Sequence, residues 1–198
     1  MPRAFRDDER AHIVAALHTA ATDAMAGRGL RRTPVAELCR AAGISKGAFY
    51  GFYDSKEALA VAVLREAEAA LRADLTAAAD GPDALDAVLR VLFEVAPARP
   101  QLALLTRPDE LQWLLRGLPE GTLATARDDD DAWFSALFDR LVARGEAHAA
   151  HREAFLGVPG AAMALAHGEP LLGHHAGATA DRIREGLLHS LTAQPSEA

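Results

Sequence analysis

The sequence predicts an all-α protein, with a small helical head followed by a larger helical body and about nine helices in all. Alanine and leucine dominate its 198 residues, and segments in which β-branched residues alternate with polar ones are essentially absent. Charge is also divided along the chain. Residues 1–56 carry nine Lys and Arg against six Asp and Glu, or +3, whereas the remainder carries −10. The pattern predicts a basic head joined to an acidic body.

Composition also restricts the compartment and the chemistry. No uncharged apolar run reaches the length needed to cross a bilayer, and residues 1–10 lack the apolar core of a secretory signal. We therefore expect a cytoplasmic protein without a membrane partner. The single cysteine, Cys39, rules out an intramolecular disulfide and a four-cysteine zinc site.

The first helix is expected to begin near Asp7 or Asp8, whose carboxylates can cap free amides, and to end at Gly27 and Gly29. Its apolar residues recur at helical spacing on one face, namely Ile13, Leu17, Ala20, Ala21 and Ala24. Thr33 and Pro34 are typical of an N-cap followed by a first-turn proline. A short helix is therefore predicted from Pro34 to about Ala42.

A tight turn and a second short helix follow. Gly43 is suited to the left-handed conformation that closes a helix, and Ser45 can cap a helix that ends near Gly51. Residues 54–57 then have capping-box spacing and introduce a longer helix that continues to about Ala78. The small core of the head is expected to consist of Leu38, Ile44, Phe49 and Leu59.

The body is predicted to contain helices near residues 83–96, 101–118 with an interruption at Pro108, 122–144, 153–167 and 179–193. Residues 168–177 are rich in Gly, Pro and His and predict a long loop. We place the domain boundary inside the fourth helix, so that the head comprises residues 1–60 and the body residues 61–198.

The segment from Thr33 to Leu59 resembles the TetR/AcrR family of bacterial regulators. A Thr precedes an apolar helix and Ala-Gly-Ile, and Ser-Lys-Gly, an apolar-Tyr pair, aromatic residues and Ser-Lys-Glu-Ala-Leu then follow in order. The resemblance covers roughly residues 13–64. It implies a ligand-responsive transcription regulator, a repressor by default, that binds a palindromic operator in double-stranded DNA as a homodimer and is released by a small-molecule inducer.

In a helix-turn-helix the start of the second helix enters the major groove. Core packing would leave Lys46, Gly47, Ala48 and Tyr50 on the exposed side of that helix. By resemblance, Lys46 to Ala48 read bases, while Thr33, Tyr50 and Lys56 bind the phosphate backbone. One phosphate contact is in doubt, because Gly51 and Phe52 stand where the family often has a His or Tyr. The alternative is that Tyr50, Phe52 and Tyr53 are core aromatics.

The resemblance further implies a cavity for a small-molecule inducer in the body. Because the candidate lining is aromatic and aliphatic and the body carries −10, we expect an uncharged or cationic, largely apolar inducer. The expected lining of the cavity comprises Phe93, Leu104, Trp113, Trp133, Phe134, Leu137 and Phe138, although most apolar residues of these helices must be ordinary core. The last two helices carry small and apolar residues suited to packing between subunits. The expected dimer contacts are Ala161, Leu165, Ile183, Leu187 and Leu191.

The sequence also offers two alternatives. His148 and His151, the pair His174 and His175, and the acidic run 128–131 favour an all-helical metal-binding protein if the resemblance is wrong. Adjacent histidines point in different directions, however, and an acidic run is most simply a solvated helix face. An enzyme is not expected, because no nucleophile elbow, phosphate-binding glycine loop or His-Glu-x-x-His helix is found. No cofactor is expected.

Overall fold

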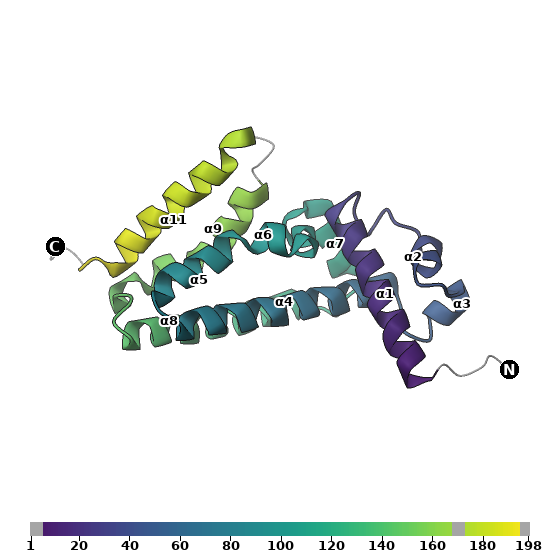
Figure 1. The fold of residues 1–198 in the computed structure, drawn as a ribbon. Coiled ribbons are helices and arrows are strands. Elements are labelled where there is room, and N and C mark those ends of the chain that lie inside the picture. The colour runs from purple at the N-terminus through teal and green to yellow at the C-terminus, as the bar shows by residue number, and fades with distance from the viewer. Residues whose placement is uncertain (1–5, 168–172, 195–198) are drawn as a thin grey trace. The chain divides into compact units, whose positions relative to one another are not determined.

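The computed structural model describes residues 6–167 and 173–194, and its regular elements in these ranges are all helical (Figure 1). The predicted all-α fold is therefore confirmed. Contacts divide the chain into two compact units. The first unit comprises Met1–Glu68 with Pro100–Pro119, and the second comprises Ala69–Arg99 with Glu120–Ala198. The functional boundary expected at residue 60 stays a prediction.

The first unit contains the helices expected of the head and two further elements. They are α1 (Asp7–Ala26), α2 (Val35–Ala41), α3 (Lys46–Phe49), the first part of α4 (Lys56–Asp80), the 3-10 helix η1 (Pro100–Thr106) and α7 (Pro108–Arg116). The predicted head core is confirmed, since Leu38, Phe49 and Leu59 are buried and Ile44 packs against them. Leu104 from η1 and Leu114 from α7 complete the same cluster.

Two helix starts differ from the expected capping. At α1, neither Asp7 nor Asp8 is the N-cap. That residue is Arg6, whose amide donates to Glu9 Oε2 at 3.0 Å. At α2 the N-cap is Pro34 rather than Thr33, because the Thr33 hydroxyl donates to the Gly29 carbonyl four residues earlier instead of accepting from the helix.

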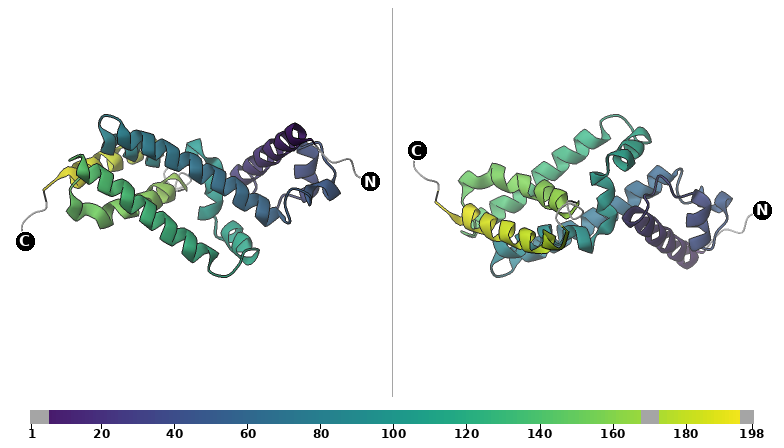
Figure 2. Two further views of the ribbon diagram at one scale, coloured as in Figure 1. Left: turned by 90° about the horizontal axis from the view of Figure 1, so that it is seen from below. Right: turned by 90° about the horizontal axis from the view of Figure 1, so that it is seen from above.

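The second unit contains the remaining part of α4, α5 (Ala84–Phe93), α6 (Val95–Ala98), α8 (Thr122–Ala143), η2 (Ala149–His151), α9 (Arg152–His167), η3 (Gly173–His175) and α11 (Ala176–Thr192). Helices α5, α9 and α11 contact one another, and Figure 2 shows α9 and α11 side by side. Their shared core centres on Leu85, Leu89, Phe138 and Phe155, with the Phe138 and Phe155 ring centroids 4.9 Å apart.

The second unit departs from the prediction at two places. The helix expected over 83–96 ends at Phe93, and a short separate helix follows. Pro97 has no amide hydrogen to donate to the Phe93 carbonyl, which explains the interruption. The predicted loop 168–177 ends earlier than expected, because η3 begins at Gly173 and α11 at Ala176. Residues 168–172 of that loop lie outside the described residues.

A search of the described residues for membrane spans found no helix that combines the necessary length and apolar character.

Candidate nucleic-acid interface

The turn between α2 and α3 has the geometry that a helix-turn-helix needs. Gly43 has φ +67°, in the left-handed region that was predicted for it. The Ile44 amide then donates to the Cys39 carbonyl at 2.9 Å, which closes α2. Ser45 begins the next helix, because its hydroxyl oxygen accepts from the Ala48 amide at 3.1 Å. Local hydrogen bonds therefore fix the direction in which α3 leaves the turn.

The residues of α3 divide between core and solvent as expected. Phe49 is fully buried, whereas Lys46 and Gly47 are exposed and half of Tyr50 is accessible. Ala48 is half-buried, so it presents less surface than the two residues before it. The Tyr50 ring meets the edge of Phe49 with centroids 5.3 Å apart, which holds the phenol at the end of the helix.

Two predicted phosphate-binding residues instead face the protein. The Thr33 side chain is 2% exposed, and its hydroxyl accepts from Arg28 Nε at 3.2 Å while donating to Gly29. Lys56 donates to the carbonyls of Arg31 and Thr33 at 2.7 and 3.0 Å and lies 5.1 Å from the centroid of the Trp113 ring. Burial lowers the pKa of the Lys56 ammonium. The backbone roles assigned to these residues stay predictions.

Tyr53 lies in a three-membered polar chain that links α1 to α4. His18 contacts the Tyr53 hydroxyl through Nε2 at 2.6 Å and the Glu66 carboxylate through Nδ1 at 2.5 Å. Burial, with a smaller effect from the Glu66 charge, raises the pKa of the Tyr53 phenol. Phe52 is covered by the guanidinium of Arg10, 4.6 Å from its centroid. Both aromatics therefore contribute to the internal packing of the first unit.

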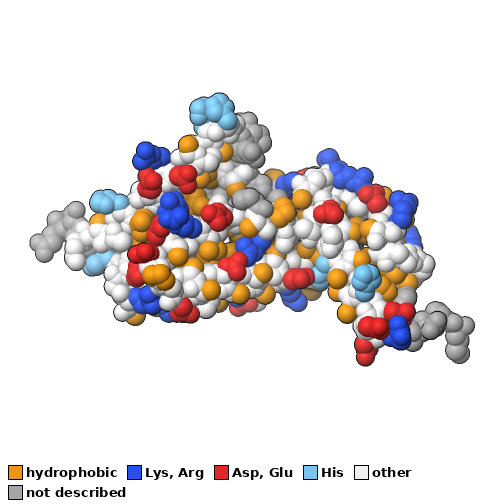
Figure 3. All heavy atoms as spheres, in the orientation of Figure 1, with side chains coloured by type: hydrophobic (Ala, Val, Ile, Leu, Met, Phe, Trp, Pro, Cys, Tyr) orange, Lys and Arg blue, Asp and Glu red, His pale blue; other side chains and the backbone are white. Residues whose placement is uncertain are grey.

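Cationic side chains surround α2, and several are paired with acids of the same unit. Arg28 pairs with Glu37, and Asp109 lies 3.5 Å from Arg31 and 3.8 Å from Arg32. In the space-filling view, Lys and Arg side chains lie over the loop between α1 and α2 and beside α2 (Figure 3). This surface can meet the phosphates that flank a major groove.

Sequence reasoning missed two residues that contact the loop between α1 and α2, namely the N-cap of α7, Arg107, and Glu110 in its first turn. Arg107 donates to the carbonyls of Met25, Ala26 and Gly27 at 2.8 to 3.2 Å. Glu110 accepts from the Arg31 amide at 3.0 Å. The sequence indicates the start of a helix at Pro108, but no spacing rule connects it to a loop some 80 residues earlier.

The predicted ligand residues do not form one group. Leu104 and Trp113 pack in the core of the first unit, whereas Phe93, Trp133, Phe134, Leu137 and Phe138 belong to the core cluster of the second. Leu137 and Phe138 are almost fully buried there. Trp133 and Phe134 are partly exposed and meet edge to face at 5.1 Å, and Arg72 lies 5.3 Å from the Trp133 ring.

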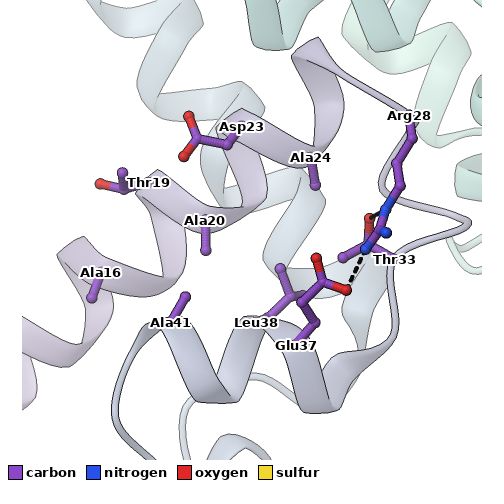
Figure 4. Close-up of a pocket in the computed structure, with 10 residues that line it drawn as sticks. All are labelled: Ala16, Thr19, Ala20, Asp23, Ala24, Arg28, Thr33, Glu37, Leu38 and Ala41. Carbon is purple, nitrogen blue, oxygen red and sulfur yellow. Dashed lines mark hydrogen bonds and ion pairs between the residues drawn. The ribbon is translucent and has the colours of Figure 1, made fainter.

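A groove of about 590 Å³ lies within the first unit, between α1 and α2 (Figure 4). The side chains of Ala16, Ala20 and Ala24 face Ala41 and Leu38 across it, and the Arg28–Glu37 pair stands at one end. The groove exists because these alanine side chains are too short to fill the space between α1 and α2. None of the predicted ligand residues lines it.

The predicted dimer contacts differ in how much surface they present. Ile183 on α11 is 41% exposed and Ala161 on α9 is exposed, whereas Leu165 and Leu187 are half-buried. Leu191 is fully buried in the core of the second unit, which leaves its side chain no area for a partner.

The metal-binding alternative depends on the histidines of the second unit. His148 and His151 have ring centroids 6.0 Å apart, and His151 Nε2 is hydrogen-bonded to the Ala193 carbonyl. Among the described residues, no three His, Cys, Asp or Glu side chains gather in a way that could hold a metal ion.

Comparisons with known proteins agree with this geometry. Residues 17–63 match the family model described as bacterial regulatory proteins of the tetR family. A comparison with curated proteins gives no match. A tetR-family regulatory protein from Rhodococcus RHA1 is 21% identical and has a TM-score of 0.67, with 92% of this chain and 98% of that chain covered.

Two further solved structures have the same fold. A TetR-family transcriptional regulator from Pectobacterium atrosepticum is 21% identical, with a TM-score of 0.66 and coverage of 97% of this chain and all of that chain. The fatty acid degradation regulator FadR from Bacillus halodurans is 15% identical, with a TM-score of 0.67 and coverage of 94% and 97%. The tetR-family model therefore matches the helix-turn-helix segment of this chain, and the chain shares the fold of these solved regulators.

Proposed function

We propose that this regulator binds an operator in double-stranded DNA as a homodimer in the cytoplasm, with α3 in the major groove. One observation carries the proposal. Helix α3 buries Phe49 and holds Lys46, Gly47 and Tyr50 in solvent at the start and end of the same short helix. Lys46 can reach a base edge or a phosphate, and the Tyr50 hydroxyl can donate to a phosphate. Gly47 allows the backbone to approach the bases closely.

The experiment begins with selection of bound sequences from fragmented genomic DNA, followed by affinity measurements on the enriched sequence. Lys46→Ala should change the preference among operator variants, because a base contact is worth about 1–3 kcal/mol of discrimination. Arg127→Ala serves as the charge-matched control, since Arg127 is an exposed residue of α8 in the second unit. Failure to enrich any sequence would show that the proposed DNA recognition is wrong.

We further propose that a small, largely apolar molecule binds in the second unit and lowers the affinity for the operator. The partly exposed pair Trp133 and Phe134 supports this location, because the two rings present apolar surface beside the core. By linkage, the ligand weakens DNA binding by the same factor as DNA weakens ligand binding, through about 1–3 kcal/mol of coupling. Such a ligand would make the regulator an inducible repressor.

The two tryptophans separate ligand binding from other fluorescence changes. Trp113 lies in the first unit and Trp133 in the second. A ligand that binds in the second unit should therefore quench the fluorescence of the Trp113→Phe variant, which keeps Trp133, and not that of the Trp133→Phe variant. Each compound that quenches is then titrated into the protein–operator complex. Compounds that quench Trp133 and never release DNA would contradict an inducer role for this position.

For the dimer, the structure favours Ile183 as the test position. Leu187 also packs against the protomer's own core, so a charge there would disturb folding as well as association. Ile183→Asp places a charge on an exposed apolar position of α11 and should shift the protein toward monomer in sedimentation experiments. An Ile183→Asp protein that remains a dimer would place the interface elsewhere.

A further inference from the structure

The described part of the chain buries only two polar side chains, and both bond to the same loop. Thr33 is 2% exposed and Glu110 is 3% exposed. Thr33 belongs to the loop between α1 and α2, and Glu110 reaches that loop from α7. Burial of a carboxylate is costly unless hydrogen bonds compensate it, so the contact with the loop is a specific one.

Glu110 holds the loop at close range. Its Oε2 accepts from the Arg31 amide at 3.0 Å. Gly29 has φ +97°, and a Cβ at that position would collide with the Glu110 carboxylate. The close approach therefore depends on a residue without a side chain and with access to positive φ. Sequence reasoning assigned Gly29 only to the end of α1.

Arg107 and Lys56 hold the carbonyls of the same region. The guanidinium of Arg107 donates to Met25, Ala26 and Gly27, which include carbonyls at the end of α1 that have no helical amide to accept from. The Lys56 ammonium donates to the carbonyls of Arg31 and Thr33. One amide and five carbonyls of residues 25–33 are thus bonded to side chains from α4 and from residues 107–110.

The loop determines where α2 begins, and α2 is connected to α3 through the fixed turn at Gly43. We propose that Glu110 and Arg107, which lie far outside the segment that matches the family model, are positioning residues for the DNA interface. They hold the loop between α1 and α2, and hence the start of α3, in the orientation that enters the groove. This assignment rests on the DNA recognition proposed above.

A positioning role differs in its consequences from a contribution to overall stability alone. Loss of the Glu110 carboxylate removes no exposed side chain of α3, so the number of phosphate contacts in the complex, and hence the salt slope, should not change. The free protein would instead order its loop on binding, which weakens affinity for the operator. A merely stabilising residue would not change the operator affinity of protein that is fully folded.

The test compares three variants of the full chain at a temperature where all of them are folded. Glu110→Ala should weaken operator binding about tenfold, the size expected when a buried hydrogen bond that pre-organises a surface is lost. Glu110→Gln keeps an acceptor oxygen and should recover most of the affinity. Gln112→Ala is the control, because Gln112 is an exposed and uncharged residue of the same helix, and it should bind like the wild type.

Amide hydrogen exchange supplies a readout that does not need DNA. In Glu110→Ala the Arg31 amide should exchange faster, while the amides of the buried residues of α1, such as Leu17, keep their protection. Unchanged exchange at Arg31, wild-type affinity in Glu110→Ala, or a Gln variant as weak as the Ala variant would each overturn the assignment. A wild-type chain that enriches no DNA sequence overturns the proposed function instead, even where the exchange data show that Glu110 holds the loop.

Discussion

Replacing Gly47 with Ala adds one methyl group at the second residue of α3, and the structure indicates that the fold accepts it. The nearest atom that the new Cβ would meet is Ser45 Oγ at 3.9 Å, an ordinary van der Waals distance. The backbone at Gly47 is helical and is not in the left-handed region. Ala is favoured over Gly in a helix by about 0.5–1 kcal/mol, so the free energy of unfolding should stay constant or rise slightly.

The same methyl should impair DNA binding if α3 approaches the bases as proposed. An added methyl group in a close-packed contact costs about 1–3 kcal/mol, because neighbouring groups must move apart to accommodate it. Since about 1.4 kcal/mol corresponds to a factor of ten, operator affinity should fall roughly tenfold or more. Stability and affinity would then change independently, or in opposite directions.

The assay pairs urea unfolding, followed by tryptophan fluorescence, with operator binding by fluorescence anisotropy. Gly177→Ala is the matched control, because Gly177 is also the second residue of its helix and a Cβ there would meet nothing within 4 Å. The control should bind DNA like the wild type. If Gly47→Ala also binds like the wild type, the start of α3 is not the part of the protein that enters the groove.

Three further predictions concern the interior of the first unit. Gly43→Ala should lower the free energy of unfolding, measured by denaturant titration, by about 1–2 kcal/mol. The new Cβ would meet no atom within 4 Å, but the φ of +67° is unfavourable for a residue with a side chain. Cys39 is only 2% exposed, and burial raises the pKa of its thiol. Iodoacetamide should therefore modify Cys39 only when urea unfolds the first unit, and rapid modification without urea would contradict this prediction. The pKa of the Tyr53 phenol is raised in the folded protein, so its contribution to the free energy of unfolding is fully present below pH 10.0, the ordinary pKa of a tyrosine, and is lost as pH rises through the raised pKa. In Tyr53→Phe, the free energy of unfolding measured against pH should no longer show this loss at alkaline pH.

The parts of the first unit that sequence predicts well depend on short-range chemistry. The turn at Gly43, the cap at Ser45 and the burial of Leu38, Phe49 and Leu59 each follow from residues a few positions apart. Backbone sterics and helix-end hydrogen bonds act over that distance, so the sequence contains the whole cause. The first and second elements of the helix-turn-helix could therefore be placed to within a few residues.

The direction of individual polar side chains could not be predicted in the same way. Thr33 precedes a Pro and looks like a helix cap, yet its hydroxyl bonds back to Gly29. Lys56 stands at the start of a helix, where a cation was expected to point toward phosphate. Its ammonium instead lies over the Trp113 ring and donates to two loop carbonyls. The Thr33 bond is a local one that competes with the cap, whereas the Lys56 contact with Trp113 depends on the position of α7, which only long-range packing determines.

The same packing changes the electrostatics of DNA recognition. Residues 1–56 carry +3, but the first unit as folded, Met1–Glu68 with Pro100–Pro119, contains 12 Lys and Arg against 11 Asp and Glu, or +1. Arg28, Arg31 and Arg32 are paired with carboxylates, and Lys56 is directed to carbonyls. Charge attraction to phosphate is therefore weaker than the sequence indicates. Specific binding must then depend more on close contact between the start of α3 and the bases, and so on residues such as Glu110 that keep α3 in position.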